Sequence, residues 1–466
     1  MRLLHAIHDF LPRHIAGSEI YAQRLCRELA SRHHVSVLCA EYDAGRRHGH
    51  VTWRVFDDLQ VIEIVNNWQC ASFAETYRPP LIGDRIAHVM RAIQPDVVHV
   101  HNLLNLSFDL PSLAAQYGAP VVATLHDYTL VCPSGGQRVH QSEQHVCHSI
   151  DSARCARCFR ESPFFTQTAF GRLSAVTRGP GLPGRAASVL SAMARRLPTV
   201  AGGLVRAVAH MPHMALTAQD MDDRLVAARE VFRQVDTFVA PSASIASEFE
   251  QLGVDRSKIR VSDYGFVPLR PLPRNGGRGP LRIGYIGTLV WHKGVHVLLD
   301  AARSLPSSSY ELKIFGDTNV FPEYTAGLRA KAAGLPVSFM GAFDPQNAAD
   351  AYGQIDVLVV PSLWLENSPL VIHEAFMAGV PVVGARIGGI VDLLEEGRNG
   401  LMYEPSSAAA LGCVLRELVD TPELMRKLAA GVRTGPPVKS IAQDACEWEA
   451  IYADVINRRA APQPVT

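Results

Sequence analysis

The fold class is decided by residues 366–390, which read ENSPLVIHEAFMAGVPVVGARIGGI. A helix that begins near Ser368 would place Glu374 two turns in and leave Glu366 in the loop before it. The run ends at a glycine turn and continues into the apolar stretch Val380–Val383. A helix, a glycine turn and a buried strand form one unit of an α/β domain with a parallel sheet. Both carboxylates can then face one cleft and accept hydrogen bonds from the vicinal hydroxyls of a sugar or ribose.

The same alternation runs along most of the chain, in two blocks on either side of the Pro/Gly/Arg-rich segment Pro268–Pro280. Two such blocks predict an α/β protein with two Rossmann-like domains that face each other across a ligand-binding cleft. The expected units are residues 1–268, a linker at 269–280, residues 281–440, and a helix within 441–466 that packs back on the first domain. Expected strands are Leu3–Ile7, Val35–Cys39, Val97–His101, Val121–Leu125, Thr237–Ala240, Val261–Tyr264, Leu281–Ile286, Glu311–Phe315, Val337–Met340, Val357–Val360 and Pro381–Gly384, with a hairpin over Val51–Val65.

Composition narrows the class of protein. The 466 residues are 47% hydrophobic and 19% charged, which supplies large cores. The 45 Lys and Arg balance the 45 Asp and Glu, so no nucleic-acid partner is expected. The N-terminus reads as a strand rather than a signal peptide, and no apolar run is long enough for a membrane span. Nine scattered cysteines suit a reducing compartment, so we expect a cytoplasmic protein.

An insertion at about 160–218 departs from the neutral balance, with seven arginines and one glutamate among bulky apolar residues. One interpretation is a basic amphipathic helical segment that touches an anionic membrane at its inner face. The other is a helical lid whose arginines lie in solvent.

Two further glycine-rich turns can hold phosphate groups. Gly287 ends a strand, and Lys293 then precedes a helix, where its ammonium group suits a diphosphate. An ordinary surface lysine is the alternative. Gly388 and Gly389 precede another helix and allow backbone N–H groups to approach an anion.

Together these motifs resemble the donor-binding domain of family 4 retaining glycosyltransferases, which have the two-Rossmann GT-B architecture. The resemblance covers about residues 281–405. It is looser in the first block, where Ala16-Gly17-Ser18-Glu19 stands at the family's Gly-Gly-x-Glu loop. His126-Asp127-Tyr128, which runs into Cys132-Pro133, resembles a subgroup that builds bacterial surface polysaccharides.

The resemblance implies transfer of a sugar from a nucleotide diphosphate donor, with retention, to a glycan or lipid-linked acceptor. No cofactor is required for that reaction. The first domain would serve the acceptor and the second the donor. By resemblance Glu374 holds the ribose, Glu366 the transferred sugar, Lys293 the leaving diphosphate, His126 the region of the anomeric centre, and Gly17 the phosphates. Catalytic residues would be His126, Lys293 and Glu366, and donor-binding residues Gly17, Gly287, Lys293, Glu366, Glu374, Gly388 and Gly389.

Three positions depart from the family pattern. Thr288 replaces an arginine, Asn367-Ser368-Pro369 replaces the usual Phe-Gly, and Ala16 replaces the first loop glycine. His292 or a nearby arginine would have to replace the missing cation. The alternative function is therefore a non-catalytic nucleotide-sugar-binding subunit that assembles at the membrane surface.

Four of the nine cysteines, Cys132, Cys147, Cys155 and Cys158, fall within 27 positions. Cys155-x-x-Cys158 has the spacing of a metal knuckle, and four thiolates fit a tetrahedral structural Zn²⁺ that staples the loop after His126. His145 and His148 are alternative ligands. Free thiols or a labile disulfide are the other interpretations.

Overall fold

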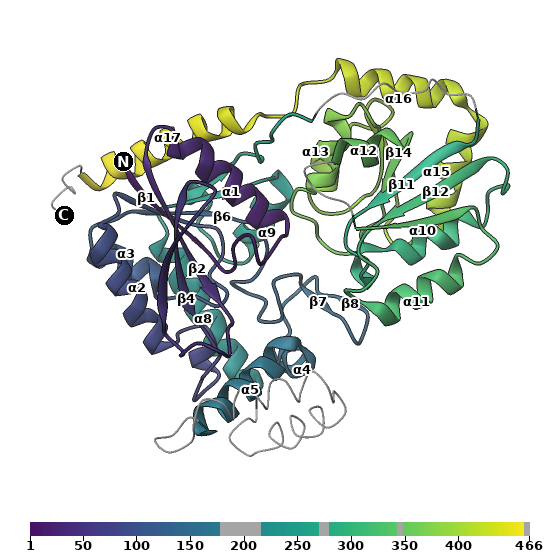
Figure 1. Ribbon diagram of the computed structural model, residues 1–466. Coiled ribbons are helices and arrows are strands. Elements are labelled where there is room, and N and C mark those ends of the chain that lie inside the picture. The colour runs from purple at the N-terminus through teal and green to yellow at the C-terminus, as the bar shows by residue number, and fades with distance from the viewer. Residues whose placement is uncertain (178–215, 270–278, 343–347, 461–466) are drawn as a thin grey trace.

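The computed structural model describes residues 1–177, 216–269, 279–342 and 348–460. Two α/β domains lie next to each other, and the chain returns to the first domain after the second is complete (Figure 1). The expected α/β class with two Rossmann-like domains is confirmed. Most of the expected linker and residues 178–215 of the expected basic insertion lie outside the described ranges. No helix within those ranges is long and apolar enough to cross a membrane.

An eight-stranded sheet forms the centre of the N-terminal domain. Its order is β10-β9-β6-β5-β1-β2-β4-β3, and β3 alone pairs antiparallel with its neighbour, as the hairpin expected at 51–65. The strands are β1 (Arg2–Ile7), β2 (His34–Glu41), β3 (Val51–Phe56), β4 (Leu59–Val65), β5 (Val97–Val100), β6 (Val121–Thr124), β9 (Thr237–Ala240) and β10 (Ile259–Val261).

Helices cover both faces of this sheet, and each face has its own apolar core. One core contains side chains of α2 (Pro80–Ile93), α3 (Leu110–Gln116), α8 (Ala218–Gln234) and α9 (Ala243–Gln251). The other contains those of α1 (Gly17–Ala30) and α17 (Ile441–Ala460). The remaining described elements before the linker are η1 (Ala74–Thr76), β7 (Val139–His140), β8 (His145–Val146), α4 (Ser152–Glu161), α5 (Pro163–Thr177) and η3 (Arg256–Lys258).

The C-terminal domain has a wholly parallel six-stranded sheet in the order β13-β12-β11-β14-β15-β16. Its strands are β11 (Leu281–Ile286), β12 (Tyr310–Phe315), β13 (Val337–Gly341), β14 (Val357–Val360), β15 (Val382–Ala385) and β16 (Gly400–Tyr403). Its helices are η4 (Trp291–Lys293), α10 (Val295–Ala302), α11 (Pro322–Lys331), α12 (Ala348–Gly353), α13 (Leu370–Met377), α14 (Ile390–Leu393), α15 (Ala408–Asp420) and α16 (Pro422–Thr434).

Some element boundaries differ from the sequence-based expectation. The strand expected at Val261–Tyr264 ends at Val261, and β16 is a strand that is not among those expected from the sequence. Helix α13 begins at Leu370 rather than near Ser368, because Pro369 has an extended backbone with ψ 114° and no N–H to donate.

Helix α17 lies on the N-terminal domain against α1 (Figure 1). The indole of Trp448 is buried, its ring centroid is 4.0 Å from that of His99, and its Nε1 donates to the hydroxyl of Tyr21 at 3.0 Å. Tyr452 is also buried, and its hydroxyl lies 2.7 Å from His99 Nδ1. The last helix therefore completes the core of the first domain.

Replacing Trp448 with alanine should lower the free energy of unfolding by about 3–5 kcal/mol, because it leaves a cavity and removes the indole N–H that donates to the Tyr21 hydroxyl. Urea denaturation followed by circular dichroism measures this. Cys446→Ala, at an exposed position of the same helix, is the control and should stay within about 0.5 kcal/mol of wild type. Equal stability of the two variants would show that α17 contributes little.

Candidate active site

An ion pair joins two loops at the carboxyl end of the second sheet. Strands β11 and β14 are neighbours, so the turn after β11 and the loop after β14 lie side by side. Lys293 Nζ donates to Glu366 Oε1 at 2.7 Å, and Ser362 Oγ donates to the same oxygen at 2.5 Å. The Glu366 side chain is 5% exposed and that of Lys293 27%. Burial raises the pKa of Glu366, but Lys293 and Ser362 outweigh burial and hold that pKa below its ordinary value.

The backbone around Glu366 packs directly on the two glycines of the next loop. The N–H of Gly389 donates to the Glu366 carbonyl at 2.7 Å, and a Cβ on Gly389 would lie 1.7 Å from the Asn367 carbonyl oxygen. Only glycine fits there. The helix that follows, α14, is a single turn. The anion site expected at its N-terminus therefore receives only a small contribution from the helix dipole. The glycines thus position Glu366.

Glu374 lies one turn into α13 and has a different set of partners. The hydroxyl of Tyr352 donates to Glu374 Oε2 at 2.9 Å. Burial raises the pKa of Glu374, while this hydrogen bond and the charge of Arg24 on α1 act in the opposite direction. The structure therefore places the two glutamates of the motif in separate contacts.

Asn367 joins the two domains. Its side-chain amide donates to the Leu125 carbonyl at 3.1 Å, and Ser242 Oγ donates to its own carbonyl at 2.7 Å. Leu125 and Ser242 follow strands β6 and β9, so the carboxyl ends of both sheets meet at this residue. The sequence marked Asn367 only as a departure from the family pattern.

Ser368 and His373 extend that interface. Ser368 Oγ donates to Asp263 Oδ1 at 2.8 Å, and His373 Nε2 lies 3.1 Å from Asp263 Oδ2. Burial raises the pKa of Asp263, but His373 and Ser368 outweigh it, and that pKa is lowered overall. Here too the position that departs from the family pattern makes a contact between domains.

The two N-terminal residues assigned by resemblance lie beside this interface. A Cβ on Gly17 would lie 3.0 Å from the Leu370 side chain, so the start of α1 approaches the start of α13. The ring of His126 has its Nε2 3.0 Å from His101 Nδ1 and its Nδ1 3.0 Å from the Tyr264 hydroxyl. Burial lowers the pKa of His126 to about 3. Its ring is therefore neutral at neutral pH, and both ring nitrogens are hydrogen-bonded inside the domain.

His126 ends a row of histidines, His5, His99 and His101, that are buried and are not among the residues singled out from the sequence. His5 Nδ1 lies 3.0 Å from His101 Nε2, and His99 Nε2 lies 2.8 Å from Thr124 Oγ1. Burial lowers the pKa of His5 to about 3. These imidazoles are neutral hydrogen-bonding links between strands. Only their alternation at 99 and 101 within one apolar strand hinted at a shared face.

The site's missing cation is not replaced by a histidine. Thr288 is exposed and its carbonyl accepts from the hydroxyl of Tyr285 at 2.8 Å. His292 is 2% exposed, and burial, followed by the charge of Lys293, lowers its pKa to about 4. It is therefore uncharged at neutral pH. Gly287, with φ 153°, ends β11 before this turn.

A cluster of titratable residues at the carboxyl end of the first sheet was missed from sequence. His8 Nε2 lies 3.3 Å from Glu19 Oε1 and 3.8 Å from Asp9 Oδ2. His14 Nε2 lies 3.7 Å from Glu41 Oε1. His8, Asp9 and His14 follow β1, Glu41 ends β2, and Glu19 lies in the first turn of α1. A position at the carboxyl end of a parallel strand was the available clue.

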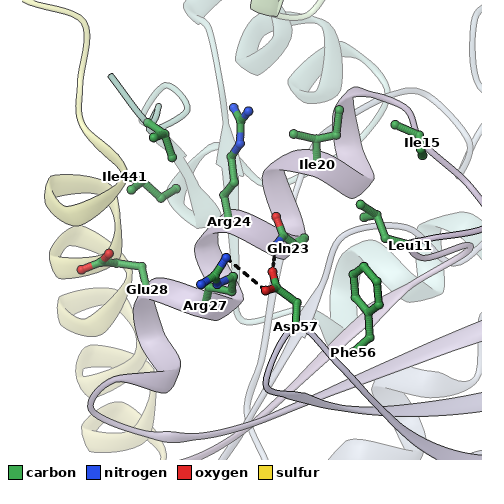
Figure 2. Close-up of a pocket in the computed structure, with 11 residues that line it drawn as sticks. Leu11, Ile15, Ile20, Gln23, Arg24, Arg27, Glu28, Phe56, Asp57 and Ile441 are labelled. Carbon is green, nitrogen blue, oxygen red and sulfur yellow. Dashed lines mark hydrogen bonds and ion pairs between the residues drawn. The ribbon is translucent and has the colours of Figure 1, made fainter. Parts of the chain in front are cut away.

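Figure 2 shows a cavity of about 760 Å³ on the N-terminal domain beside α1. Arg27 pairs with Asp57 at 3.1 Å, whereas Arg24 extends away from that pair (Figure 2). Arg24 is half-buried, and the charge of Glu374 acts on it. The other lining residues are Leu11, Ile15, Ile20, Gln23, Glu28, Phe56, Val267 and Ile441.

The four clustered cysteines line a single small cavity of about 30 Å³ as free thiols. Burial is the main cause that raises the pKa of Cys155 to about 12, and the other three cysteines add to it. Burial is also the main cause that raises the pKa of Cys158, to about 11. His145 and His148 are not among the residues that line this cavity.

Two Rossmann-like domains that meet at the carboxyl ends of their sheets have the GT-B architecture that the resemblance implies. Residues 15–163 match the family model described as Glycosyltransferase Family 4, and residues 280–421 match that described as Glycosyl transferases group 1. The chain belongs to family 4 of the glycosyltransferases.

Individual relatives are distant. The D-inositol 3-phosphate glycosyltransferase of Streptomyces scabiei is 28% identical over 48% of this chain and 55% of its own length. A putative colanic acid biosynthesis glycosyltransferase, WcaL of Escherichia coli K12, is 28% identical over 50% and 57%. The chain thus spans about half the length of the curated relatives it matches. The Anabaena protein HepE, solved with UDP, has a TM-score of 0.56 at 15% identity over 99% of this chain and 98% of its own, which shows a shared fold.

Lys293→Met should leave the Glu366 carboxylate buried and unpaired, raise its pKa, and lower the free energy of unfolding by about 3–5 kcal/mol. The double variant with Glu366→Gln should recover most of that loss. Because the wild-type pKa is lowered, the pair's contribution is present at neutral pH and is lost as the pH falls through the folded-state pKa. Urea denaturation of wild type, Lys293→Met, Glu366→Gln and the double variant, each at several pH values, measures this. A Lys293→Met variant as stable as wild type at pH 7 would contradict it.

Proposed function

We propose that this chain is a retaining glycosyltransferase that moves a sugar from a nucleoside diphosphate donor to a glycan or lipid-linked glycan, in the synthesis of bacterial surface polysaccharides. The observation that carries the proposal is the Lys293–Glu366 pair at 2.7 Å, set where the two domains meet. A cation and a carboxylate at one point suit a diphosphate and the hydroxyls of its sugar.

Donor recognition is assigned to the C-terminal domain. Glu366 would accept hydrogen bonds from the transferred sugar, and Glu374, held by Tyr352, from the ribose. HepE, which shares the fold, has been solved with UDP and with UDP-glucose. A nucleoside diphosphate sugar is therefore the donor class to test.

In the proposed reaction the bond between the anomeric carbon and the diphosphate oxygen breaks. The acceptor oxygen forms its bond on the same face, and its proton passes to the leaving diphosphate. Lys293 would stabilise the charge that develops there, which is an electrostatic contribution of the kind that dominates such reactions. His126 would contact the donor sugar near the anomeric centre with a neutral ring, both of whose nitrogens are hydrogen-bonded inside the domain.

The cavity in Figure 2 suits a lipid-linked acceptor. Six of its eleven lining residues are apolar, among them Ile15, whose side chain is 61% exposed. The charge of Arg24 lies at its edge, close enough to Glu374 to act on that carboxyl. An apolar wall beside an arginine fits a lipid chain joined to a phosphate.

Thr288 supports the second candidate, a non-catalytic subunit that binds nucleotide sugars. With an exposed threonine at the family's arginine and a neutral His292, Lys293 is the cation that contacts the site carboxylate. Such a subunit would bind a donor without turning it over.

A panel of UDP-, GDP-, ADP- and dTDP-sugars, with lipid-linked and free glycans, tests the function through release of nucleoside diphosphate and mass spectrometry of product. NMR of the product should show a retained anomeric configuration. Lys293→Ala should lower turnover about 100- to 1,000-fold. Glu374→Gln should raise the donor Kd about tenfold or more. The exposed Glu423→Gln is the control. Donor binding without release by wild type would favour the subunit.

Arg24→Gln should raise the KM for a phosphate-containing lipid-linked acceptor about tenfold, because it removes a charge-assisted hydrogen bond. Arg27→Gln, at an exposed and already paired arginine of the same helix, should change it little. The donor Kd, measured in parallel, shows whether Arg24→Gln instead acts on donor binding through Glu374. An unchanged acceptor KM in Arg24→Gln would remove this cavity from the acceptor site.

A further inference from the structure

We propose that Cys132, Cys147, Cys155 and Cys158 bind one structural Zn²⁺, which holds the hairpin of β7 and β8 against the C-terminal domain. The four side chains come from three separate segments: the loop after β6, the loop after β8, and two positions one turn apart on α4. All four line one cavity of about 30 Å³, the size of a single ion or water rather than an organic ligand.

Side-chain rotation is needed to complete the site. The four sulfurs are not among the groups of three donors within 4.8 Å of one another, which in the described residues are His5, His99 and His101, and His8, Asp9 and Glu19. Around tetrahedral zinc, sulfurs stand about 3.8 Å apart, given Zn–S bonds of about 2.3 Å. Rotation about χ1 moves a cysteine sulfur into the cavity between them without moving the backbone.

The buried guanidinium of Arg224, beside the cluster, needs an anion nearby. Arg224 on α8 is 4% exposed, and its guanidinium donates to the backbone carbonyls of Thr129 and Leu130 rather than to a carboxylate. Apart from Tyr77, the titratable groups that act on it are Cys132 and Cys155. A buried charge needs an opposite one. Four thiolates around Zn²⁺ carry a net charge of about −2 and supply it.

Two more arginines line the cavity itself. Arg138 is 5% exposed and donates to the His148 carbonyl at 2.7 Å. Arg154 lies on α4 next to Cys155, and its guanidinium contacts Glu143. Both arginines also pair with glutamates. Together with Arg224 they place three cations near the four sulfurs, and these charges favour the thiolate form that a metal requires, against the burial that raises the pKa of the thiols.

The segment that carries the cysteines has a small apolar core. Strands β7 and β8 are two residues each, and the nearby apolar cluster comprises Ala156, Phe159, Phe165, Leu216 and Met221. Small parts of this kind commonly rely on a metal or disulfides for stability.

The hairpin lies between the domains (Figure 1). Val146 packs against the core of the C-terminal domain, and Gln141 Oε1 lies 3.4 Å from Nδ1 of His292, next to Lys293. A metal at the base of this hairpin would therefore fix a contact with the turn that carries the site's cation.

Metal analysis of the full chain, purified under reducing conditions, tests the proposal without any variant. We expect about one zinc per chain. Cobalt exchanged into the protein should give the thiolate charge-transfer and tetrahedral ligand-field bands. Protein without zinc that also fails to bind added zinc or cobalt would overturn the proposal. So would a native mass lower by two hydrogens per disulfide among these cysteines.

Variants then identify the ligands. Cys147→Ser and Cys155→Ser should each lose the metal, whereas Cys413→Ser with Cys446→Ser, at exposed positions outside the cluster, should retain it. In hydrogen–deuterium exchange, chelation should increase exchange at 139–150 and at 291–293, with β14 and β15 unchanged. Full zinc content in both cluster variants, or unaltered exchange after metal removal, would contradict the assignment.

Discussion

The turn at residues 366–368 packs on the backbone of Gly389, and the arrangement of the site depends on that contact. With the Asn367 carbonyl where a Cβ on Gly389 would be, the turn has no freedom to shift. Glu366 is thereby directed to Lys293, and Asn367 to the Leu125 carbonyl in the other domain. One close approach between two loops therefore determines both the ion pair and the meeting of the domains.

Charge at the site is kept local by burial. The Glu366 carboxylate remains ionised because Lys293 and Ser362 lower its pKa by more than burial raises it. His292 and His126 remain neutral because burial is the main influence on each imidazole and lowers its pKa. Lys293 is thus the cation paired with Glu366 in the described residues, and the two imidazoles serve as neutral groups. Such a site suits electrostatic stabilisation better than proton transfer by histidine.

The region where the chain crosses between domains is also polar and buried. Asp444 accepts from the Tyr21 hydroxyl, the Gly265 N–H and Lys439 Nζ, and Tyr264 bonds His126. Helix α17 thus joins the crossing point to the histidine row of the first sheet. Buried polar groups must keep their hydrogen-bond partners, so this network favours a single position of α17, with the residues just before it, on the N-terminal domain.

Much of the fold was predictable because apolar periodicity reports burial directly. The strands of both sheets and the paired-glutamate motif follow from local pattern, and so does the presence of a lysine before α10. The start of α13 was misplaced because Pro369 can either open a helix or precede it. Strand β16 was missed because four residues between turns carry almost no periodicity.

The sequence by itself determined which residue types stand at the ends of which strands, since spacing along a strand or helix is a local property. Only the tertiary structure decided their partners. It paired Lys293 with Glu366 and Tyr352 with Glu374, joined His126 to His101, and brought Cys132 to the other three cysteines and Arg224. Those contacts join segments far apart in the chain, and they exist because each sheet brings together the loops that follow non-consecutive strands, which no local pattern encodes.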